Sequence, residues 1–360
     1  MCYLKTSCTI LVLLAFSFNL ASQEKNIAGG SVINQGTVVS ESLSSTILRD
    51  NKVGLDTRRQ IKVVLPAGYA SSKKAYPVVY YLHSIYGKAE WIIGNGAKKL
   101  IERAVAKGLV NEFIFVIPDF SSPNIGSLYE NSPVSGRWLD HFSQEIVPFI
   151  DSKYRTIRKS GARAVIGDFM GGRGALQLGM SHADTFGVVY ALHPVALGVG
   201  TRPWTELGIN WEKIFKAKTY ADLGGDKPCE TFVAICQAFL PHPGKTPFHC
   251  DYFMKQDSSG MTVDIEKMVK IQKAFMLEQR LGESAGNLRK LRGLAFDWAR
   301  YDPNFDHVYA GRAFTRNLED IGIEHEAEEY RGTPWNHTWD DEGRFYTRVL
   351  PFLNSHLEFE

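Results

Sequence analysis

One short stretch constrains the fold of this chain more than any other. The apolar segment Ala164–Ile166 ends at Gly167, and glycine returns at Gly171 and Gly172. Small residues two positions before and two positions after a central residue let a strand turn sharply into a helix, and the turn then exposes the central side chain. Counted from Gly167, the central residue is Phe169. Its phenyl ring has no group that could attack a carbonyl.

Segments with strand patterns alternate with segments with helix patterns along most of the chain. Continuous apolar runs at 77–82, 113–118 and 187–192 are typical of strands that are buried on both faces. Apolar residues recur at helical spacing over 97–105 and 138–150. This alternation predicts an α/β fold with a mostly parallel central sheet flanked by helices.

The interval 196–292 breaks the alternation. We predict that it forms a lid or small subdomain, inserted over the carboxyl edge of the sheet where such folds bind ligands. It contains Cys229, Cys236 and Cys250. Three is an odd number, so at most one internal disulfide forms; buried free thiols are the alternative.

The N-terminus has the pattern of a cleavable secretory signal over residues 1–22. Lys5 supplies a positive charge, residues 10–20 are mostly apolar, and this run is too short to span a bilayer. Residues 23–36 are polar and predict a flexible terminus, followed by one domain over 37–360. We expect a secreted or periplasmic protein without a membrane span.

Charge and motif content exclude several partners and cofactors. The net charge is +2, and the absence of a long Lys/Arg run argues against nucleic acid or an anionic membrane as the partner. His83, His193, His337 and Asp168 are candidate metal ligands. Their spacing matches no metal-binding motif, so we expect no metal and no other cofactor.

Several segments resemble, in order, the esterase D, feruloyl esterase and antigen 85 group of α/β-hydrolases. The segments are 63–69 (L-P-x-G-Y), 76–83 (Y-P-V-x-Y-x-x-H-G), 135–138 before the turn, and 167–172 (G-x-S-M-G-G). The resemblance covers about residues 37–195 and 293–357. It implies an α/β-hydrolase fold and descent from a carboxylic ester hydrolase or acyl transferase.

The resemblance also implies a catalytic triad in the order serine, acid, histidine. The acid falls at Asp302 and the histidine at His337. The backbone N–H groups of Ser84 and Met170 fall at the oxyanion hole.

This chain departs from the family pattern at three positions. Phe169 stands at the serine position, and Ser84 stands where the family usually has glycine. Relatives often place the histidine two residues after a glycine, but here Pro334 follows Gly332 at that spacing, so His337 is a shifted assignment.

Other assignments remain open around the predicted turn. If the register is shifted by one residue, Asp168 lies at the tip and is a carboxylate nucleophile. Asp306 is the alternative acid, although it also has the pattern of a helix N-cap. Asp297 lies within a strand and is less well placed. We expect Arg173 to make a surface or helix-end contact.

Substrate contacts are predicted for four further residues. His83 and His193 each end a predicted strand, and Trp138 and Trp211 supply aromatic surface. The expected partner is a small-molecule, glycan or lipid ester, and the oligomeric state is not predicted.

Three hypotheses for function follow. The first is a pseudoenzyme: an exported esterase-family protein that has lost the serine mechanism and binds an ester, an acylated sugar or a lipid-like ligand. The second is an active ester hydrolase or acyl transferase that uses Asp168, or a water activated by His337 and Asp302. The third is a serine esterase in which Phe169 is a recent lesion.

Overall fold

A computed structural model of the chain describes residues 35–202, 204–337 and 339–360, and at residue 337 it describes the backbone alone. The predicted signal segment, residues 1–22, and all but the last two residues of the predicted flexible segment, 23–36, lie outside the described residues.

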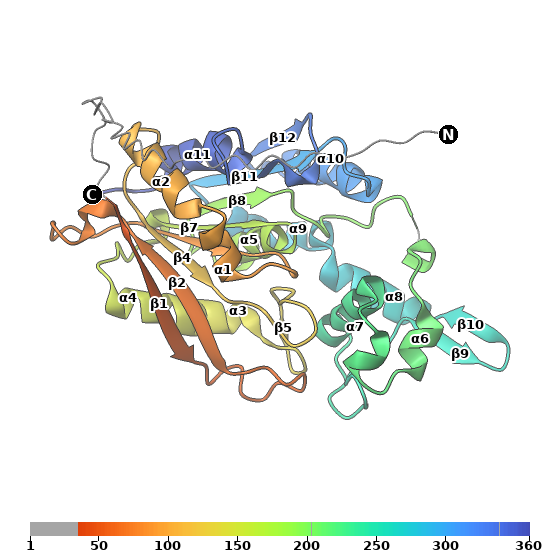
Figure 1. Ribbon diagram of the computed structural model, residues 1–360. Helices are drawn as coiled ribbons and strands as arrows, with labels where there is room; N and C mark the ends of the chain where they lie inside the picture. Colours follow the sequence, from red (N-terminus) through yellow and green to blue (C-terminus); the bar gives the residue numbers. More distant parts are fainter. Residues whose placement is uncertain (1–34, 203, 338) are drawn as a thin grey trace, which may run out of the picture. The chain divides into compact units, whose positions relative to one another are not determined.

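The central sheet has eight strands in the order β1-β2-β4-β3-β7-β8-β11-β12 (Figure 1). Their bounds are β1 (Thr37–Ser44), β2 (Arg58–Leu65), β3 (Val78–Leu82), β4 (Ile114–Pro118), β7 (Arg163–Asp168), β8 (Val188–Leu192), β11 (Gly293–Ala299) and β12 (Glu326–Tyr330). Strand β2 pairs antiparallel with β1 and with β4, and the other neighbouring pairs are parallel. The predicted α/β class with a mostly parallel sheet is confirmed.

Strand β3 shows why the sheet requires helices on both faces. All five of its residues are buried. Val78, Tyr80 and Leu82 belong to one hydrophobic core, and Val79 and Tyr81 belong to a second. Because successive side chains of a strand point to opposite faces, the continuous apolar run places one core on each side of the sheet.

Two groups of helices cover these cores. The core of Val79 and Tyr81 is completed by α1 (Ala89–Gly94), α2 (Ala97–Ala106), the π-helical turn Phe345–Val349 and α11 (Leu350–His356). The opposite core is completed by α3 (Trp138–Asp140), the π-helical turn His141–Ile146, α4 (Val147–Lys153), α5 (Met170–Ser181), α9 (Leu281–Leu288) and α10 (Phe305–Asp320).

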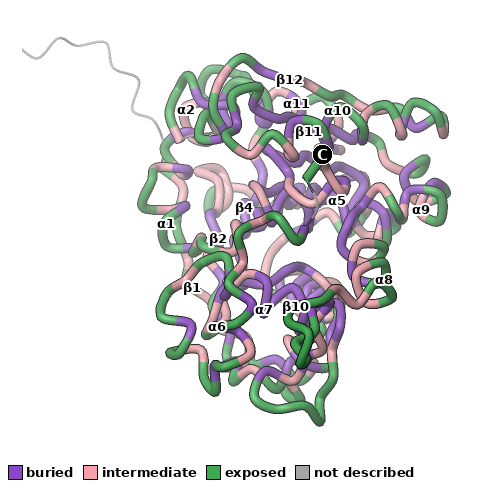
Figure 2. Tube along the Cα trace, turned by 90° about the vertical axis from the view of Figure 1, so that its right-hand side faces the viewer, coloured by how far each residue is buried: buried purple, intermediate pink, exposed green. Residues whose placement is uncertain are grey.

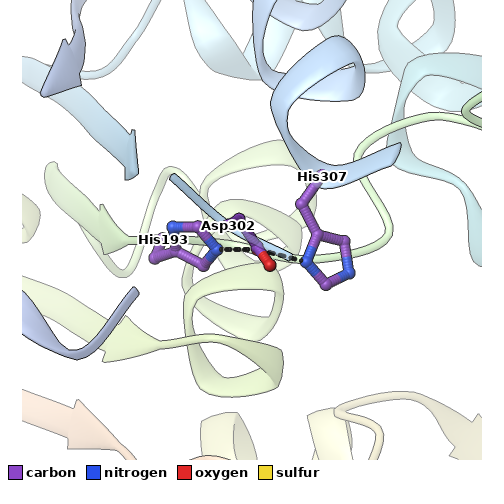
Figure 3. Close-up of side chains that lie close together, drawn as sticks. All are labelled: His193, Asp302 and His307. Atoms are coloured by element: carbon purple, nitrogen blue, oxygen red, sulfur yellow. Dashed lines mark hydrogen bonds and ion pairs between the residues drawn. The ribbon is translucent and has the colours of Figure 1, made fainter. Parts of the chain in front are cut away.

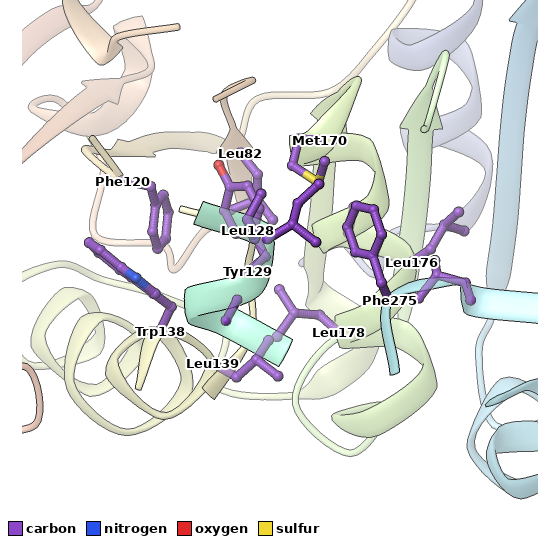
Figure 4. Packing of buried hydrophobic residues seen from close by; sticks show 14 of the residues in the cluster. Leu82, Phe120, Leu128, Tyr129, Trp138, Leu139, Met170, Leu176, Leu178 and Phe275 are labelled. Atoms are coloured by element: carbon purple, nitrogen blue, oxygen red, sulfur yellow. The ribbon is translucent and has the colours of Figure 1, made fainter. Parts of the chain in front are cut away.

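The interval between β8 and β11 carries elements of its own. They are the 3₁₀ turn Trp204–Glu206, α6 (Trp211–Lys216), the 3₁₀ turn Tyr220–Leu223, α7 (Lys227–Phe239), the hairpin β9 (Met254–Asp257) and β10 (Gly260–Val263), α8 (Ile265–Phe275) and the 3₁₀ turn Leu277–Arg280. Phe275 packs in the same core as Met170 and Leu176 of α5 (Figure 4). The core of this insertion is therefore continuous with the core of the sheet.

Short elements complete the described chain. They are the 3₁₀ turns Ala67–Tyr69, Ser160–Ala162 and Pro334–His337, and the short strands β5 (Asn131–Ser132) and β6 (Gly136–Arg137). Buried residues follow the sheet and the inner sides of its helices, whereas exposed residues predominate on outer turns and on the β10 hairpin (Figure 2). In the part of the chain that the structure describes, no helix is both long enough and apolar enough to cross a membrane.

Candidate functional site

The sharp turn lies between β7 and α5. Phe169 joins them with φ 48° and ψ −112°, a backbone conformation that side-chain-bearing residues rarely adopt. Its N–H donates to the Leu192 carbonyl at 3.0 Å. A Cβ on Gly171 would lie 1.9 Å from the Leu82 carbonyl oxygen, so only glycine lets α5 approach β3 this closely.

The turn presents an aromatic ring to its surroundings. The Phe169 side chain is half-buried. Its ring centroid lies 5.3 Å from the His193 ring and 5.3 Å from the Trp335 ring. These spacings are those of aromatic packing contacts. The tip of the turn therefore contributes packing, and it offers no oxygen, sulfur or nitrogen for attack on a carbonyl.

One of the two predicted oxyanion-hole donors has a partner in the protein. The Ser84 N–H donates to Asp168 Oδ1 at 3.1 Å. Asp168 is the last residue of β7 and is 8% exposed. An oxyanion hole works through donors preorganised toward the developing negative charge. A carboxylate on the Ser84 N–H occupies that donor and places negative charge beside the hole. Met170, the other predicted donor, begins α5.

A hydrogen-bonded cluster lies at the ends of β8 and β11 and the start of α10 (Figure 3). Asp302 Oδ2 accepts from His193 Nε2 at 2.7 Å and from His307 Nδ1 at 2.8 Å. Its Oδ1 accepts from the Asn304 N–H at 2.7 Å. Burial alone would raise the pKa of the Asp302 carboxyl, but the hydrogen bonds from His193 and His307 outweigh it and hold that pKa well below its usual value.

Neighbouring groups fix the proton positions in this cluster. The Ala299 N–H donates to His193 Nδ1 at 3.0 Å, so the proton of neutral His193 lies on Nε2 and points to Asp302. Arg202 Nη2 donates to Asn304 Oδ1 at 2.9 Å. The Asn304 amide nitrogen therefore faces His307 Nε2, at 2.9 Å, and the His307 proton lies on Nδ1. Both rings have partners at both nitrogens.

The residue types in this cluster could bind a metal ion, but the positions of their protons do not suit one. Ligand atoms of His193, Asp302 and His307 all lie within 4.8 Å of one another. A metal-bound imidazole nitrogen must offer a lone pair. His193 Nε2 carries the proton because Nδ1 accepts a backbone N–H. The arrangement fits a hydrogen-bond network centred on Asp302 and does not fit metal binding.

A cavity of about 690 Å³ lies beside the turn. Its lining comes from the loop after β3, α1, the turn, the loop after β8, the insertion, the start of α10 and residues 335 and 339. The apolar lining residues are Ile85, Tyr86, Trp91, Ile92, Phe169, Met170, Pro194, Val195, Ala196, Leu197, Val199, Trp204, Leu207, Phe232, Ile235, Phe275, Met276, Ala310, Trp335 and Trp339. Such a cavity has the size and character of a site for a small apolar molecule.

Comparison with known families identifies the part of the chain that holds the turn. Residues 53–222 match the family model described as "Putative esterase". The predicted resemblance to an esterase family is confirmed over these residues.

Solved structures with the same fold are esterases and related hydrolases. A ferulic acid esterase is 20% identical, with a TM-score of 0.60 over 90% of this chain and 99% of that one. An S-formylglutathione hydrolase from Agrobacterium tumefaciens is 13% identical, with a TM-score of 0.57 over 92% of this chain and 99% of that one. At these identities the likeness shows the fold alone, and the predicted α/β-hydrolase fold is confirmed.

A curated relative is much longer than this chain. Endo-1,4-beta-xylanase Y from Acetivibrio thermocellus is 27% identical over 116 residues, which are 32% of this chain and 10% of that protein. The chain thus spans about a tenth of the length of the curated relative that it matches.

The structure does not bring all the predicted substrate-binding residues to the cavity. The ring of His83 joins the ends of β3 and β4, because its Nε2 accepts the Phe120 N–H at 2.8 Å. Trp138 is 2% exposed and donates to the Ser135 carbonyl. Trp211 packs 4.8 Å from Phe253 within the insertion. None of these three residues lines the cavity, and neither does the fourth, His193, because each ring is buried in a core or against a strand end.

One prediction about a neighbouring residue is wrong, and a second holds in one of its two forms. Asp306 is not the N-cap of α10, because Asn304 holds that position and Asp306 lies in the first turn. Arg173 is fully buried and makes no surface contact. It makes a helix-end contact, because its guanidinium donates to the carbonyl of Phe275, the last residue of α8, and also to the carbonyl of Leu128. The helical position of Arg173, directly after the turn, aims its side chain at the insertion.

Of the two predicted triad partners, the structure describes the side chain of Asp302 alone. Asp302 lies in the cluster described above. His337 ends the 3₁₀ turn Pro334–His337, and its side chain is outside the described part of the chain. The pairing of Asp302 with His337 therefore stays a prediction. Asp297 accepts from the His193 N–H and from Arg344 Nε, which accounts for its burial within β11.

His307 and Asn304 were not predicted from the sequence as site residues. Both line the cavity, and both bind Asp302. The segment Asp302–His307 carries the signal that could have identified them: a carboxylate is followed by a helix start, so a histidine in the first helical turn can reach back to it. Cys229, Cys236 and Cys250 are buried free thiols, which is the alternative to a disulfide that the sequence left open.

Proposed function

We propose that this protein binds an apolar ester or acyl compound in the cavity beside the turn and does not cleave it by a serine mechanism. Phe169 at the tip of the turn, with its φ of 48°, carries the proposal. In a hydrolase of this fold that backbone strain serves to expose a nucleophile. Here the strain is retained and the exposed side chain is a phenyl ring.

Two further observations support loss of the serine mechanism. The Ser84 N–H donates to the Asp168 carboxylate. The Asp302 carboxylate accepts from three donors within its own cluster. A triad needs a free nucleophile, an available oxyanion hole and a carboxylate committed to the catalytic histidine. Here the Ser84 N–H, a predicted oxyanion-hole donor, is bonded to Asp168. The Asp302 carboxylate is bonded to His193, Asn304 and His307.

We also propose that the protein is exported. The support for export is the signal pattern of residues 1–22.

The second candidate is hydrolysis by an altered mechanism. Asp168 favours it, because its carboxylate lies directly before the tip of the turn and lines the cavity. The His337 and Asp302 pair is the other form of this candidate. Either form predicts turnover that resists serine-directed phosphonates and disappears in Asp168→Asn or His337→Ala.

Titration calorimetry with ethyl ferulate and p-nitrophenyl decanoate, combined with an assay of product release, tests the proposal. Leu207 lines the cavity and is half-buried. Leu207→Trp should weaken binding by about tenfold or more because the larger ring fills the site. Ile209→Trp is the matched control, since Ile209 is also half-buried but does not line the cavity.

We expect saturable binding without product release in the parent protein. Rapid product release by the parent would refute the proposal, as would equal effects of the two tryptophan variants on binding.

A further inference from the structure

The cavity has an exposed edge and a buried interior. Tyr86, Trp91 and Trp335 are 44%, 54% and 67% exposed, respectively, and form the edge. The interior is formed by residues of the loop after β8 and of the insertion that are less than 10% exposed: Leu197, Trp204, Phe232, Ile235, Phe275 and Met276. A ligand that fills the cavity therefore buries one end in apolar surroundings and leaves the other end near solvent.

Charge is distributed unevenly over the same lining. Lys88 is exposed at the edge, and its Nζ lies 6.0 Å from the centroid of the Trp91 ring. Among the described residues that line the cavity, no other lysine and no arginine is present. No described carboxylate forms an ion pair with Lys88. Of the carboxylates that line the cavity, Asp168 accepts from the Ser84 N–H. Asp306 accepts from the Thr201 N–H and from Arg202 Nε.

The positive charge of Lys88 therefore favours a negative ligand group at the exposed edge. An ester bound as in a serine hydrolase would place its carbonyl at Ser84 and the turn. Here that position offers a phenyl ring and a donor already bonded to a carboxylate. The polar end of a ligand has its best partner at the exposed edge.

We propose that the cavity takes a single-chain amphiphile with an anionic head, with the apolar chain in the interior and the head at Lys88. This inference rests on the proposed binding function and specifies its ligand class. Each methylene of the chain that enters the interior should tighten binding about fourfold. The anionic head should add about three- to fivefold, as expected for an ion pair at an exposed site.

The test is calorimetry below the critical micelle concentration with a matched ligand set. Octanoate, decanoate and dodecanoate measure the dependence on chain length. Dodecanoate, dodecyl phosphate, methyl dodecanoate and dodecyltrimethylammonium measure the dependence on head charge, and the first two distinguish a carboxylate from a phosphate head. The variants are Lys88→Gln and, as control, Lys99→Gln, which changes an exposed lysine of α2 that does not line the cavity.

The inference predicts that dodecanoate or dodecyl phosphate binds more tightly than methyl dodecanoate, and that Lys88→Gln removes this preference while Lys99→Gln retains it. Salt at 0.5 M should weaken the preference by screening. Equal binding of all four heads, or a preference unchanged in Lys88→Gln, would overturn the inference and leave the proposed function intact. If circular dichroism shows a folded protein that binds none of these ligands and no ester, the inference and the proposed function both fail.

Discussion

At the scale of single residues, the site is defined by which hydrogen-bond donors and acceptors already have partners. Phe169 places at the tip of the turn a ring that packs on His193 and Trp335. Asp302 accepts three hydrogen bonds, and it is only 4% exposed. Its donors are His193, which follows β8, and Asn304 and His307 at the start of α10, so Asp302 joins segments that lie far apart in the sequence.

Asp302→Asn tests this connection. The amide of asparagine offers one acceptor oxygen and one N–H₂ donor, so at least one donor of the cluster would face another donor. We expect the free energy of unfolding to fall by about 2 kcal/mol, measured by urea denaturation at pH 7. Asp184→Asn is the control, because the Asp184 side chain is 82% exposed. Equal stability of the two variants would show that the cluster contributes nothing to the fold.

At the scale of elements, α5 connects the sheet to the insertion. Arg173, in its first turn, donates Nε and Nη2 to the Phe275 carbonyl, at 3.1 and 2.9 Å, and Nη1 to the Leu128 carbonyl at 3.1 Å. Burial lowers the pKa of Arg173 to about 10, so the group remains charged at neutral pH. Phe275 and Met276 line the cavity, and Arg173 therefore holds one wall of the cavity against α5.

Arg173→Met should loosen the contact between α5 and the cavity wall that contains Phe275 and Met276. The methionine retains apolar volume but leaves two buried carbonyls without their donors, at a cost of about 3 kcal/mol in unfolding free energy. Amide hydrogen exchange should accelerate in α8, and the loss of ligand affinity should exceed that in the Ile209→Trp control. Slow exchange in α8 of a folded Arg173→Met protein would contradict this role.

At the scale of the whole molecule, the sequence predicted the layers well because they follow from local patterns. The buried runs that became β3, β4 and β8 and the amphipathic spacing of α2 each depend on a few neighbouring residues. Which residues of the site form hydrogen bonds with one another depends on segments that are distant in the sequence. Nothing in the pattern around Asp302 indicates His193, and nothing around Arg173 indicates Phe275, because each pair is formed by the folding of the chain between them. The same holds for Trp138 and Trp211, whose rings fill cores.

Glu145 ties the loop after β1 to the helical layer, and it makes stability depend on pH. It accepts from the Thr46 N–H and hydroxyl, both at 2.8 Å, and from His141 Nδ1 at 2.7 Å. Burial opposes ionisation, but the hydrogen bonds from Ser45, His141 and Thr46 dominate and lower the pKa of Glu145 to about 2. A carboxyl whose pKa is lower in the folded state stabilises the fold above its unfolded pKa and loses that contribution as pH falls toward its folded pKa.

The Glu145 contribution should therefore be present at pH 6 and should decline between about pH 5 and pH 2. In Glu145→Gln, the fall in unfolding free energy between pH 6 and pH 3 should be smaller than in the parent by about 1–2 kcal/mol. Urea denaturation between pH 6 and pH 3 measures the unfolding free energy of both proteins. Parallel pH profiles for parent and variant would exclude Glu145 as a source of acid sensitivity.

Hydrolysis of p-nitrophenyl butyrate by the parent and by Phe169→Ser tests the central claim most directly. We expect no turnover above background in the parent and no labelling by a fluorophosphonate. In Phe169→Ser we expect kcat at least about 10²-fold below that of a serine esterase of this fold, because the Ser84 N–H is bonded to Asp168. Parent turnover that disappears in Asp168→Asn or His337→Ala, or full serine-type activity restored by Phe169→Ser alone, would contradict the account.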